Sequence, residues 1–209
     1  IACNTATAHA LDALRAVSPV PVMGVIDPGA RAAARATTRG HVGVIATAGT
    51  VASGAYRRAL MAARADLAVT EQPCPLLVPL VEEGWLDHQA TRLVAAEYLE
   101  PLRAAGVDTL VLGCTHYPML KPLIAGIMGP DVRLIDSADE AASDLAGVLA
   151  REGIEAAPGT AVSQRWAATD DPARFTRVGA VFMGGAPAPV ERVQLGCETP
   201  SAERGQARV

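Results

Sequence analysis

The feature that most constrains the fold is a short apolar run that ends in glycine and cysteine. Residues 109–112 predict a buried strand, and Gly113 then delivers Cys114 into a turn. Pro118 fits the first turn of a following helix, where its missing N–H removes no hydrogen bond. A thiol at such a junction faces the positive end of the helix dipole, which lowers a cysteine pKa. We therefore expect Cys114 to be an activated thiol.

The same arrangement occurs once more, at the start of the sequence. Cys3 follows a small residue, small polar residues come next, and the helical spacing of Leu11 and Leu14 follows. Two such turns predict two half-molecules that each present one thiol. Inverting a carbon centre without a cofactor needs a base on one face and an acid on the other, and one thiolate and one thiol can share that task.

Strand and helix signals alternate along the rest of the chain, which predicts an α/β fold with parallel sheets. The expected strands are residues 20–26, 41–46, 66–70, 109–112, 132–135 and 164–168. The expected helices are residues 9–17, 30–38, 52–63, 88–104, 121–128 and 137–151, with a last short helix that includes Phe175.

Three details of the helices are specific enough to test. Ser137 stands three residues before Glu140, which is the spacing of a capping box. In residues 88–104 the period of Leu93, Ala96 and Leu99 predicts the buried face. Pro101 lies inside the same stretch and predicts a kink or a split into two helices.

Composition excludes several classes of protein. Half of the 209 residues are hydrophobic and 19% are charged, which supports a packed core. A net charge of −4 argues against a general nucleic-acid binder. No apolar run reaches membrane-spanning length, no signal peptide precedes Ile1, and the four cysteines are not a secreted disulfide framework. We expect a cytoplasmic protein that binds neither nucleic acid nor membrane.

The polar candidates have structural as well as functional interpretations. Cys74 and Cys197 are interpreted as small apolar residues, because a lone cysteine is usually buried. His9, His41 and His88 show no metal-ligand spacing with any cysteine, so no metal is expected.

A polar residue at a helix N-terminus can cap the helix and can also bind a carboxylate, and parallel sheets bind ligands where their strands end. Such positions are held by Asn4, Thr5, Thr47, Thr50 and Thr115.

The two cysteine segments, residues 1–8 and 112–118, resemble the two signature motifs of the glutamate racemases, within the aspartate/glutamate racemase superfamily. Residues 42–51 and 79–84 between them, and 134–138 and 169–172 after them, are also similar to that family. The resemblance runs from Ile1 to about Gly185.

This resemblance implies two parallel-sheet α/β lobes with the active site in the cleft between them. The first lobe would comprise residues 1–26 and 136–196, and the second residues 27–135, with 197–209 as a flexible tail. The family carries Asp-Ser-Gly and Pro-Tyr-Gly motifs ahead of its first cysteine, and neither stands here in a matching place. The first lobe is therefore expected to be incomplete at its N-terminus.

The resemblance also implies cofactor-independent racemisation of glutamate, with D-glutamate supplied for peptidoglycan synthesis. Cys3 would act on D-glutamate and Cys114 on L-glutamate, with Glu82 orienting His116 beside the second thiol. Thr47 and Thr50 would hold the side-chain carboxylate, and Asn4, Thr5, Thr115 and His116 would contact the substrate. No cofactor is expected, and the oligomeric state is left open, a homodimer included.

Three alternatives stand beside this assignment. An aspartate or hydantoin racemase of the same superfamily also has paired cysteines. A truncated, non-catalytic binding module would account for the missing motifs. A thiol hydrolase would use Cys114 and His116, with Glu82 as the orienting group, and would leave Cys3 unexplained.

Overall fold

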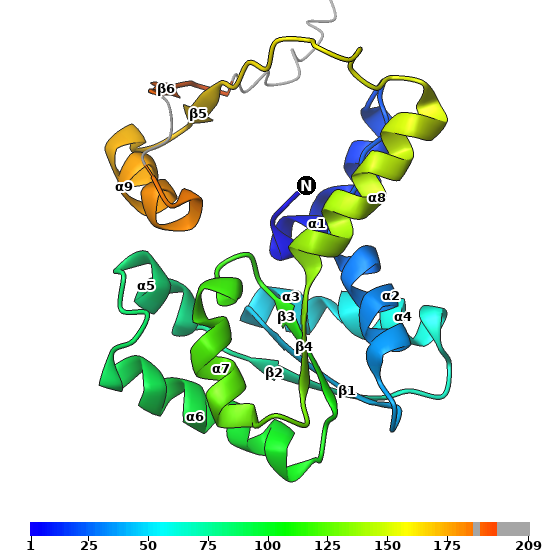
Figure 1. The fold of residues 1–209 in the computed structure, drawn as a ribbon, viewed down its shortest axis with the longest axis vertical. Coiled ribbons are helices and arrows are strands. Elements are labelled where there is room, and N and C mark those ends of the chain that lie inside the picture. The colour runs from blue at the N-terminus through cyan, green and yellow to red at the C-terminus, as the bar shows by residue number, and fades with distance from the viewer. Residues whose placement is uncertain (186–188, 196–209) are drawn as a thin grey trace, which may run out of the picture. The chain divides into compact units, whose positions relative to one another are not determined.

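The computed structural model describes residues 1–185 and 189–195. The chain forms two compact units, residues 1–158 and a second unit that begins at Gly159. The first unit is built on a four-stranded parallel sheet with the order β2-β1-β3-β4 (Figure 1). Its strands are β1 (His41–Ala46), β2 (Ala68–Pro73), β3 (Thr109–Gly113) and β4 (Arg133–Asp136). The predicted α/β class with parallel strands is confirmed.

Helices cover both faces of this sheet. One face packs against α2 (Ile26–Ala36) and α4 (Ala55–Ala63), and α8 (Ser137–Glu152) packs on α2. On the other face α6 (Gln89–Ala104) contacts α7 (Lys121–Met128) and β2. The remaining elements of the unit are α1 (Asn4–Val17), α3 (Ala48–Ser53), α5 (Leu77–Glu82) and the 3₁₀ helix η1 (Tyr117–Leu120).

Alternation along β1 divides its side chains between the two cores. Val42, Val44 and Ala46 join a buried cluster with α2 and α4. Gly43 points the other way, where a Cβ would lie 3.1 Å from both Leu102 and Leu110 side chains. Burial on both faces is typical of a parallel strand and explains its near-continuous apolar sequence.

The strand order fixes where a ligand site can form. From β1 the chain moves to β2 on one side, and it later returns to β3 on the other side of β1. In such open parallel sheets the crevice beside the carboxyl ends of the two diverging strands is the usual ligand site. Ala46 and Gly113 are paired at these ends, so the residues after β1 and β3 emerge side by side.

The second unit is described by itself. It contains β5 (Trp166–Ala168), α9 (Pro172–Met183) and β6 (Val190–Arg192), with the two short strands parallel. The Asp171 carboxylate accepts a hydrogen bond from the Ala173 N–H and caps α9, which contains the predicted Phe175. The proposed division into lobes stays a prediction, and residues 197–209 lie outside the described residues.

Two predicted segments near the N-terminus are wrong. Residues 20–24 have no strand pairing among the described residues, and Ile26 already begins α2. A strand is defined by its partners, and the main-chain carbonyl of Met23 accepts a hydrogen bond from the terminal amino group of Ile1, at 2.6 Å. The first helix begins at Asn4 rather than at His9, because Cys3 itself is the N-cap.

Three predicted helix details are also corrected. Asp136, not Ser137, caps α8, its carboxylate accepting the Ala138 N–H at 2.9 Å. Residues 52–63 are divided between α3 and α4 at Gly54, whose φ of +64° favours glycine. Helix α6 runs through Pro101 unbroken, and its buried face is Thr91, Ala95, Leu99 and Leu102, with Leu93 exposed.

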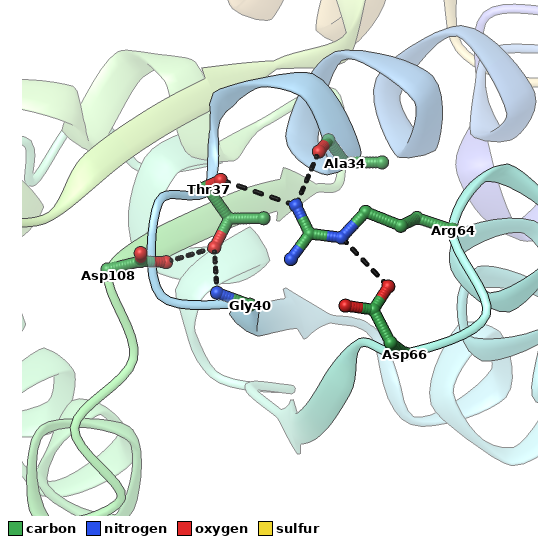
Figure 2. Close-up of polar contacts among 6 residues, drawn as sticks. All are labelled: Ala34, Thr37, Gly40, Arg64, Asp66 and Asp108. Carbon is green, nitrogen blue, oxygen red and sulfur yellow. Dashed lines mark hydrogen bonds and ion pairs between the residues drawn. The ribbon is translucent and has the colours of Figure 1, made fainter.

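The amino-terminal edge of the sheet is held by one buried carboxylate, Asp108 (Figure 2). It accepts hydrogen bonds from the Thr37 hydroxyl at 2.5 Å, the Thr38 N–H at 2.9 Å and the Arg39 N–H at 2.6 Å. Burial raises the pKa of Asp108, but these hydrogen bonds outweigh burial and lower it to about 2. The network ties the loop before β1 to the start of β3.

We expect Asp108→Asn to lower the free energy of unfolding by about 2 kcal/mol at pH 7, because an amide cannot accept all of these donors. The folded pKa lies below the usual value, so this contribution is complete above about pH 4 and is lost as the pH falls towards 2. Urea unfolding of both proteins between pH 7 and 2 measures it, and their difference should shrink across that window.

Asp66→Asn is the matched control. Asp66 also has a carboxylate, which forms an exposed ion pair with Arg64 at 3.0 Å that is drawn in Figure 2. Exposed pairs contribute little, so its loss should change stability by less than about 1 kcal/mol. Equal effects of the two substitutions would contradict the role given to Asp108.

Candidate active site

Cys114 follows the last residue of β3 and is 7% exposed. The residue before it must be glycine, because a Cβ on Gly113 would lie 2.9 Å from the Ile45 carbonyl oxygen and 2.9 Å from the Tyr56 ring. The close approach of the backbones at this point brings the thiol to the carboxyl edge of the sheet. The chain continues into η1, whose first turn contains Pro118.

The environment of Cys114 raises its pKa to about 11. Burial is the largest cause, and a charge on Cys3 adds to it, whereas the N–H groups of His116 and Tyr117 act in the opposite direction. The predicted lowering of this pKa is therefore wrong. A single turn of 3₁₀ helix follows the thiol, and its two favourable N–H groups do not offset the loss of hydration.

Cys3 stands at the start of the unit, directly before α1. It is the N-cap residue of α1, and its sulfur accepts the Ala6 N–H at 3.5 Å. Its thiol is exposed, unlike that of Cys114. A charge on Cys3 is one of the causes that raise the pKa of Cys114. Asn4, the residue after Cys3, and Gly113, the residue before Cys114, both contact the Tyr56 side chain.

His116 connects Cys114 to Glu82. Its Nδ1 lies 3.8 Å from the Cys114 sulfur, and its Nε2 lies 3.1 Å from a carboxylate oxygen of Glu82. A carboxylate at Nε2 favours a proton on that nitrogen, which leaves Nδ1 to face the sulfur. Glu82, at the end of α5, is therefore in position to orient the imidazole.

Three threonine hydroxyls form a closed triangle beside Cys3. Thr5 lies 2.8 Å from Thr47 and 3.0 Å from Thr50, and Thr47 lies 3.0 Å from Thr50. Thr47 caps α3 directly after β1, and Thr5 stands in the first turn of α1. Either hydroxyl of each pair could be the donor, and each can turn its single proton outwards, so the cluster could donate to an oxygen-rich group.

Asn4 is buried beside Cys3 and is held by a residue that sequence reasoning missed. The Tyr56 hydroxyl donates to Asn4 Oδ1 at 2.7 Å, and both side chains are at most 2% exposed. The available signal was a tyrosine in the apolar repeat of a helix, since a buried tyrosine hydroxyl needs a partner. The identity of that partner, 52 positions away, could not be derived from the repeat.

The other sequence candidates lie outside these contacts. Thr115 is exposed directly after Cys114. Cys74 is fully buried and its thiol donates to the Gln72 carbonyl at 3.5 Å, as expected of a core residue. Cys197 falls outside the described residues. Within residues 1–185 and 189–195, no group of three or more His, Cys, Asp or Glu could hold a metal ion, and no helix is long and apolar enough to cross a membrane.

Comparison with known proteins identifies the family. The family model of Asp/Glu/Hydantoin racemases matches residues 1–145. The chain belongs to this racemase family. It is 47% identical to the glutamate racemase of Geobacter metallireducens over 198 residues, which cover 95% of this chain and 73% of that protein.

Solved structures agree with this assignment. Glutamate racemase isoform RacE1 of Bacillus anthracis has a TM-score of 0.87 at 38% identity, covering 92% of this chain and 72% of that one. Glutamate racemase of Francisella tularensis in complex with D-glutamate has a TM-score of 0.84 at 34% identity, covering 92% of this chain and 71% of that one. A small-molecule substrate is therefore the expected partner of this racemase family member.

The raised pKa of Cys114 predicts how its thiol reacts. With iodoacetamide at pH 7.5, exposed Cys3 should be alkylated first, because reaction requires an accessible thiolate. Cys114 alkylation should rise about tenfold per pH unit up to about pH 10, since its thiolate fraction keeps growing below its pKa. Peptide mass spectrometry of timed samples measures each cysteine separately.

Cys74 is the internal control, because it is completely buried and should react only when the protein unfolds. Circular dichroism at each pH checks that the fold persists. A Cys114 rate that reaches its plateau near pH 8 would contradict the raised pKa.

Proposed function

We propose that this chain interconverts L-glutamate and D-glutamate without a cofactor, using Cys3 and Cys114 as a pair of acid and base. The proposal rests above all on two cysteines, 111 positions apart in the sequence, whose neighbours Asn4 and Gly113 both contact the Tyr56 side chain. One thiol could serve many reactions, but a thiol for each face of the substrate would fit the inversion of a carbon centre. The names of the relatives support glutamate as the substrate.

In the proposed reaction the α-carbon of the amino acid lies between the two sulfurs. From D-glutamate, the Cys3 thiolate removes the α-proton and the Cys114 thiol donates its proton to the opposite face, which yields L-glutamate. The Cys3 thiol and the Cys114 thiolate that result are the pair needed for the reverse direction. A raised Cys114 pKa suits the first step, because this residue then rests as the proton donor.

His116 and Glu82 would assist the Cys114 half of the cycle. A negative charge that develops on a buried sulfur needs a nearby dipole or donor. The imidazole Nδ1 lies 3.8 Å from that sulfur, and Glu82 holds the ring from the other side. We propose that Nδ1 accepts the proton of the Cys114 thiol, so that the imidazolium held by Glu82 stabilises the thiolate that removes the α-proton of L-glutamate.

The remaining polar groups would bind the two carboxylates of the substrate. The triangle of Thr5, Thr47 and Thr50 can reorient its hydroxyls towards one carboxylate. The amide nitrogen of Asn4 and exposed Thr115 lie next to the two thiols in sequence and would contact the other end. D-Glutamate made in this way would be used in the cytoplasm for peptidoglycan synthesis.

Single substitutions of the two cysteines test the two-base mechanism. Cys3→Ala and Cys114→Ala should each abolish racemisation, because each removes the acid or base on one face. Incubation with L-glutamate or D-glutamate in heavy water, followed by circular dichroism and by α-deuterium incorporation, measures inversion and proton exchange together. Cys74→Ala, the same change at a buried thiol with a core role, should continue to racemise.

The assay uses the 209-residue chain and a version extended to the length of its relatives, since the chain covers 73% of the Geobacter protein. Near-full turnover by either cysteine variant would overturn the two-base mechanism. Folded proteins of both lengths that neither racemise glutamate nor exchange its α-proton would overturn the proposed function. Faster turnover of aspartate than of glutamate would move the assignment to an aspartate-type racemase.

Glu82→Gln tests the role of the imidazole. The amide has no negative charge to stabilise a protonated imidazole, so kcat/KM should fall about tenfold to a hundredfold. The equilibrium constant of racemisation is one, which requires the same fall in both directions. Glu83→Gln, on the exposed neighbour, should leave kcat/KM unchanged. Equal losses in the two variants would contradict the role of Glu82.

One observation favours a second candidate, a thiol hydrolase. Cys114, His116 and Glu82 form the nucleophile, base and orienting group of such an enzyme. The raised pKa of Cys114 is unfavourable for a nucleophile, and Cys3 would have no role. A burst of product from a reactive ester, with an acylated Cys114 in the mass spectrum, would support the hydrolase.

A further inference from the structure

Tyr56 joins the two segments that carry the thiols. Its hydroxyl donates to Oδ1 of Asn4, the residue after Cys3, at 2.7 Å. Its ring packs against Gly113, the residue before Cys114, where an added Cβ would lie 2.9 Å from the ring carbon Cε2. Tyr56 is on α4, which contains neither cysteine, and it is completely buried. The Tyr56 side chain therefore contacts a neighbour of each of the two cysteines.

A third residue interacts with the Tyr56 hydroxyl. A hydrogen bond with the Ser137 side chain, at the start of α8, lowers the Tyr56 pKa. Burial raises that pKa more strongly, so the hydroxyl keeps its proton. The hydroxyl donates this proton to the Asn4 oxygen, 2.7 Å away.

Gly29 has no side chain, which leaves room for Ser137 beside the Tyr56 hydroxyl. A Cβ on Gly29 would lie 3.0 Å from the Ser137 Cβ and 3.6 Å from the Tyr56 hydroxyl oxygen. Ser137 is 5% exposed, Asn4 is 2% exposed and Tyr56 is fully covered. The chain Ser137–Tyr56–Asn4 is thus closed off from solvent, where each hydrogen bond defines orientation more strongly than on the surface.

The other end of the Asn4 amide is unsatisfied. Among the described residues, Nδ2 of Asn4 has no hydrogen-bond partner although the atom is buried. A buried donor without a partner is unfavourable, and such groups occur where a ligand completes the bond. Because Oδ1 is held by Tyr56, Nδ2 faces away from Tyr56 on the opposite side of the planar amide.

We propose that Tyr56 is a positioning residue of this racemase site: through Oδ1 it fixes the Asn4 amide so that Nδ2 is presented to a carboxylate of the amino-acid substrate beside Cys3. The identity of the substrate rests on the proposed function, whereas the orientation of Asn4 does not. Tyr56 touches no reacting atom and acts only through Asn4. Its ring keeps the two cysteine turns at their mutual distance.

The kinetic test is a double-mutant cycle. Tyr56→Phe keeps the ring against Gly113 and removes only the hydroxyl, so kcat/KM for glutamate should fall about tenfold to a hundredfold. Asn4→Ala removes the group that Tyr56 positions. If Tyr56 acts through Asn4, adding Tyr56→Phe to Asn4→Ala should cause no further loss. Independent, multiplying effects of the two substitutions would overturn the proposal.

Thr91→Val is the matched control for loss of a buried hydroxyl. Thr91 is fully buried on α6, and its hydroxyl donates to the Trp85 carbonyl at 2.6 Å, away from the thiols. We expect this variant to lose stability in urea unfolding as Tyr56→Phe does while keeping wild-type kcat/KM. A fall in its kcat/KM comparable to that of Tyr56→Phe would show that the kinetic effect is one of stability, and would overturn the proposal.

A readout without catalysis is available, because Asn4 is the only asparagine in the sequence. Protein labelled with ¹⁵N in the asparagine side chain gives one NH₂ pair in a proton–nitrogen correlation spectrum. In the wild type this pair should be sharp and protected from exchange with water. In Tyr56→Phe it should broaden and exchange faster, and in Thr91→Val it should match the wild type.

The same spectra separate the two proposals. Addition of L-glutamate or D-glutamate should shift the Asn4 pair in the wild type and shift it less in Tyr56→Phe. If the wild type neither shifts nor racemises glutamate, yet Tyr56→Phe frees the amide, the proposed function fails and the positioning of Asn4 stands. An Asn4 pair that is identical in wild type and Tyr56→Phe, with and without glutamate, overturns the role of Tyr56.

Discussion

The parallel pairing of β1 with β3 is the constraint on which this site depends. The register sets Ala46 opposite Gly113, so the chain leaves the sheet at two adjacent points, into Thr47 on one strand and Cys114 on the other. Sequence separation is irrelevant at that edge, because neighbouring parallel strands end together. The amino end of α1 then needs only to pack over the same edge to bring Cys3 and Thr5 to Thr47 and Thr50.

Burial at this edge of the sheet also determines the pKa of Cys114. Gly113 allows β3 to approach β1 and Tyr56 closely, and the thiol that follows is removed from water. This burial raises the pKa of Cys114. Before the reaction Cys114 is therefore better suited to donate a proton than to accept one. In the proposed reaction the exposed Cys3 complements it, because one thiolate and one thiol supply a base on one face of the substrate and an acid on the other. The unequal environments thus favour a shared task over two independent nucleophiles.

Sequence patterns predicted what is local and missed what depends on distant partners. The bounds of β1 and α7 follow from apolar runs and helix signals within the segments themselves, and both were predicted to the residue. The strand expected at residues 20–26 has the composition of a strand but no strand neighbour among the described residues. Likewise, Ser137 has the spacing of a cap, yet Asp136 is the residue whose carboxylate meets the free N–H.

The site shows the same division. Motif resemblance named Cys3, Cys114, His116 and Glu82, and the contacts of His116 with Cys114 and Glu82 join three of them. The direction of the Cys114 pKa shift could not be predicted, because the dipole argument considers the following helix and not the covering side chains. Tyr56 was missed for a similar reason, since its hydrogen bond spans 52 positions of sequence.

Buried polar groups at the two edges of the sheet differ in whether their hydrogen bonds are satisfied. This difference distinguishes a group that stabilises the fold from a group that can bind a ligand. At the amino edge, the Asp108 carboxylate accepts hydrogen bonds from donors in the loop before β1, and these stabilise its charge within the fold. At the carboxyl edge, Asn4 has its oxygen bonded to Tyr56 and its nitrogen left without a partner among the described residues. A fold selected for stability alone would satisfy both atoms, because the unsatisfied donor is unfavourable. Holding one end of an amide rigidly while leaving the other without a partner is instead what a preorganised binding group requires.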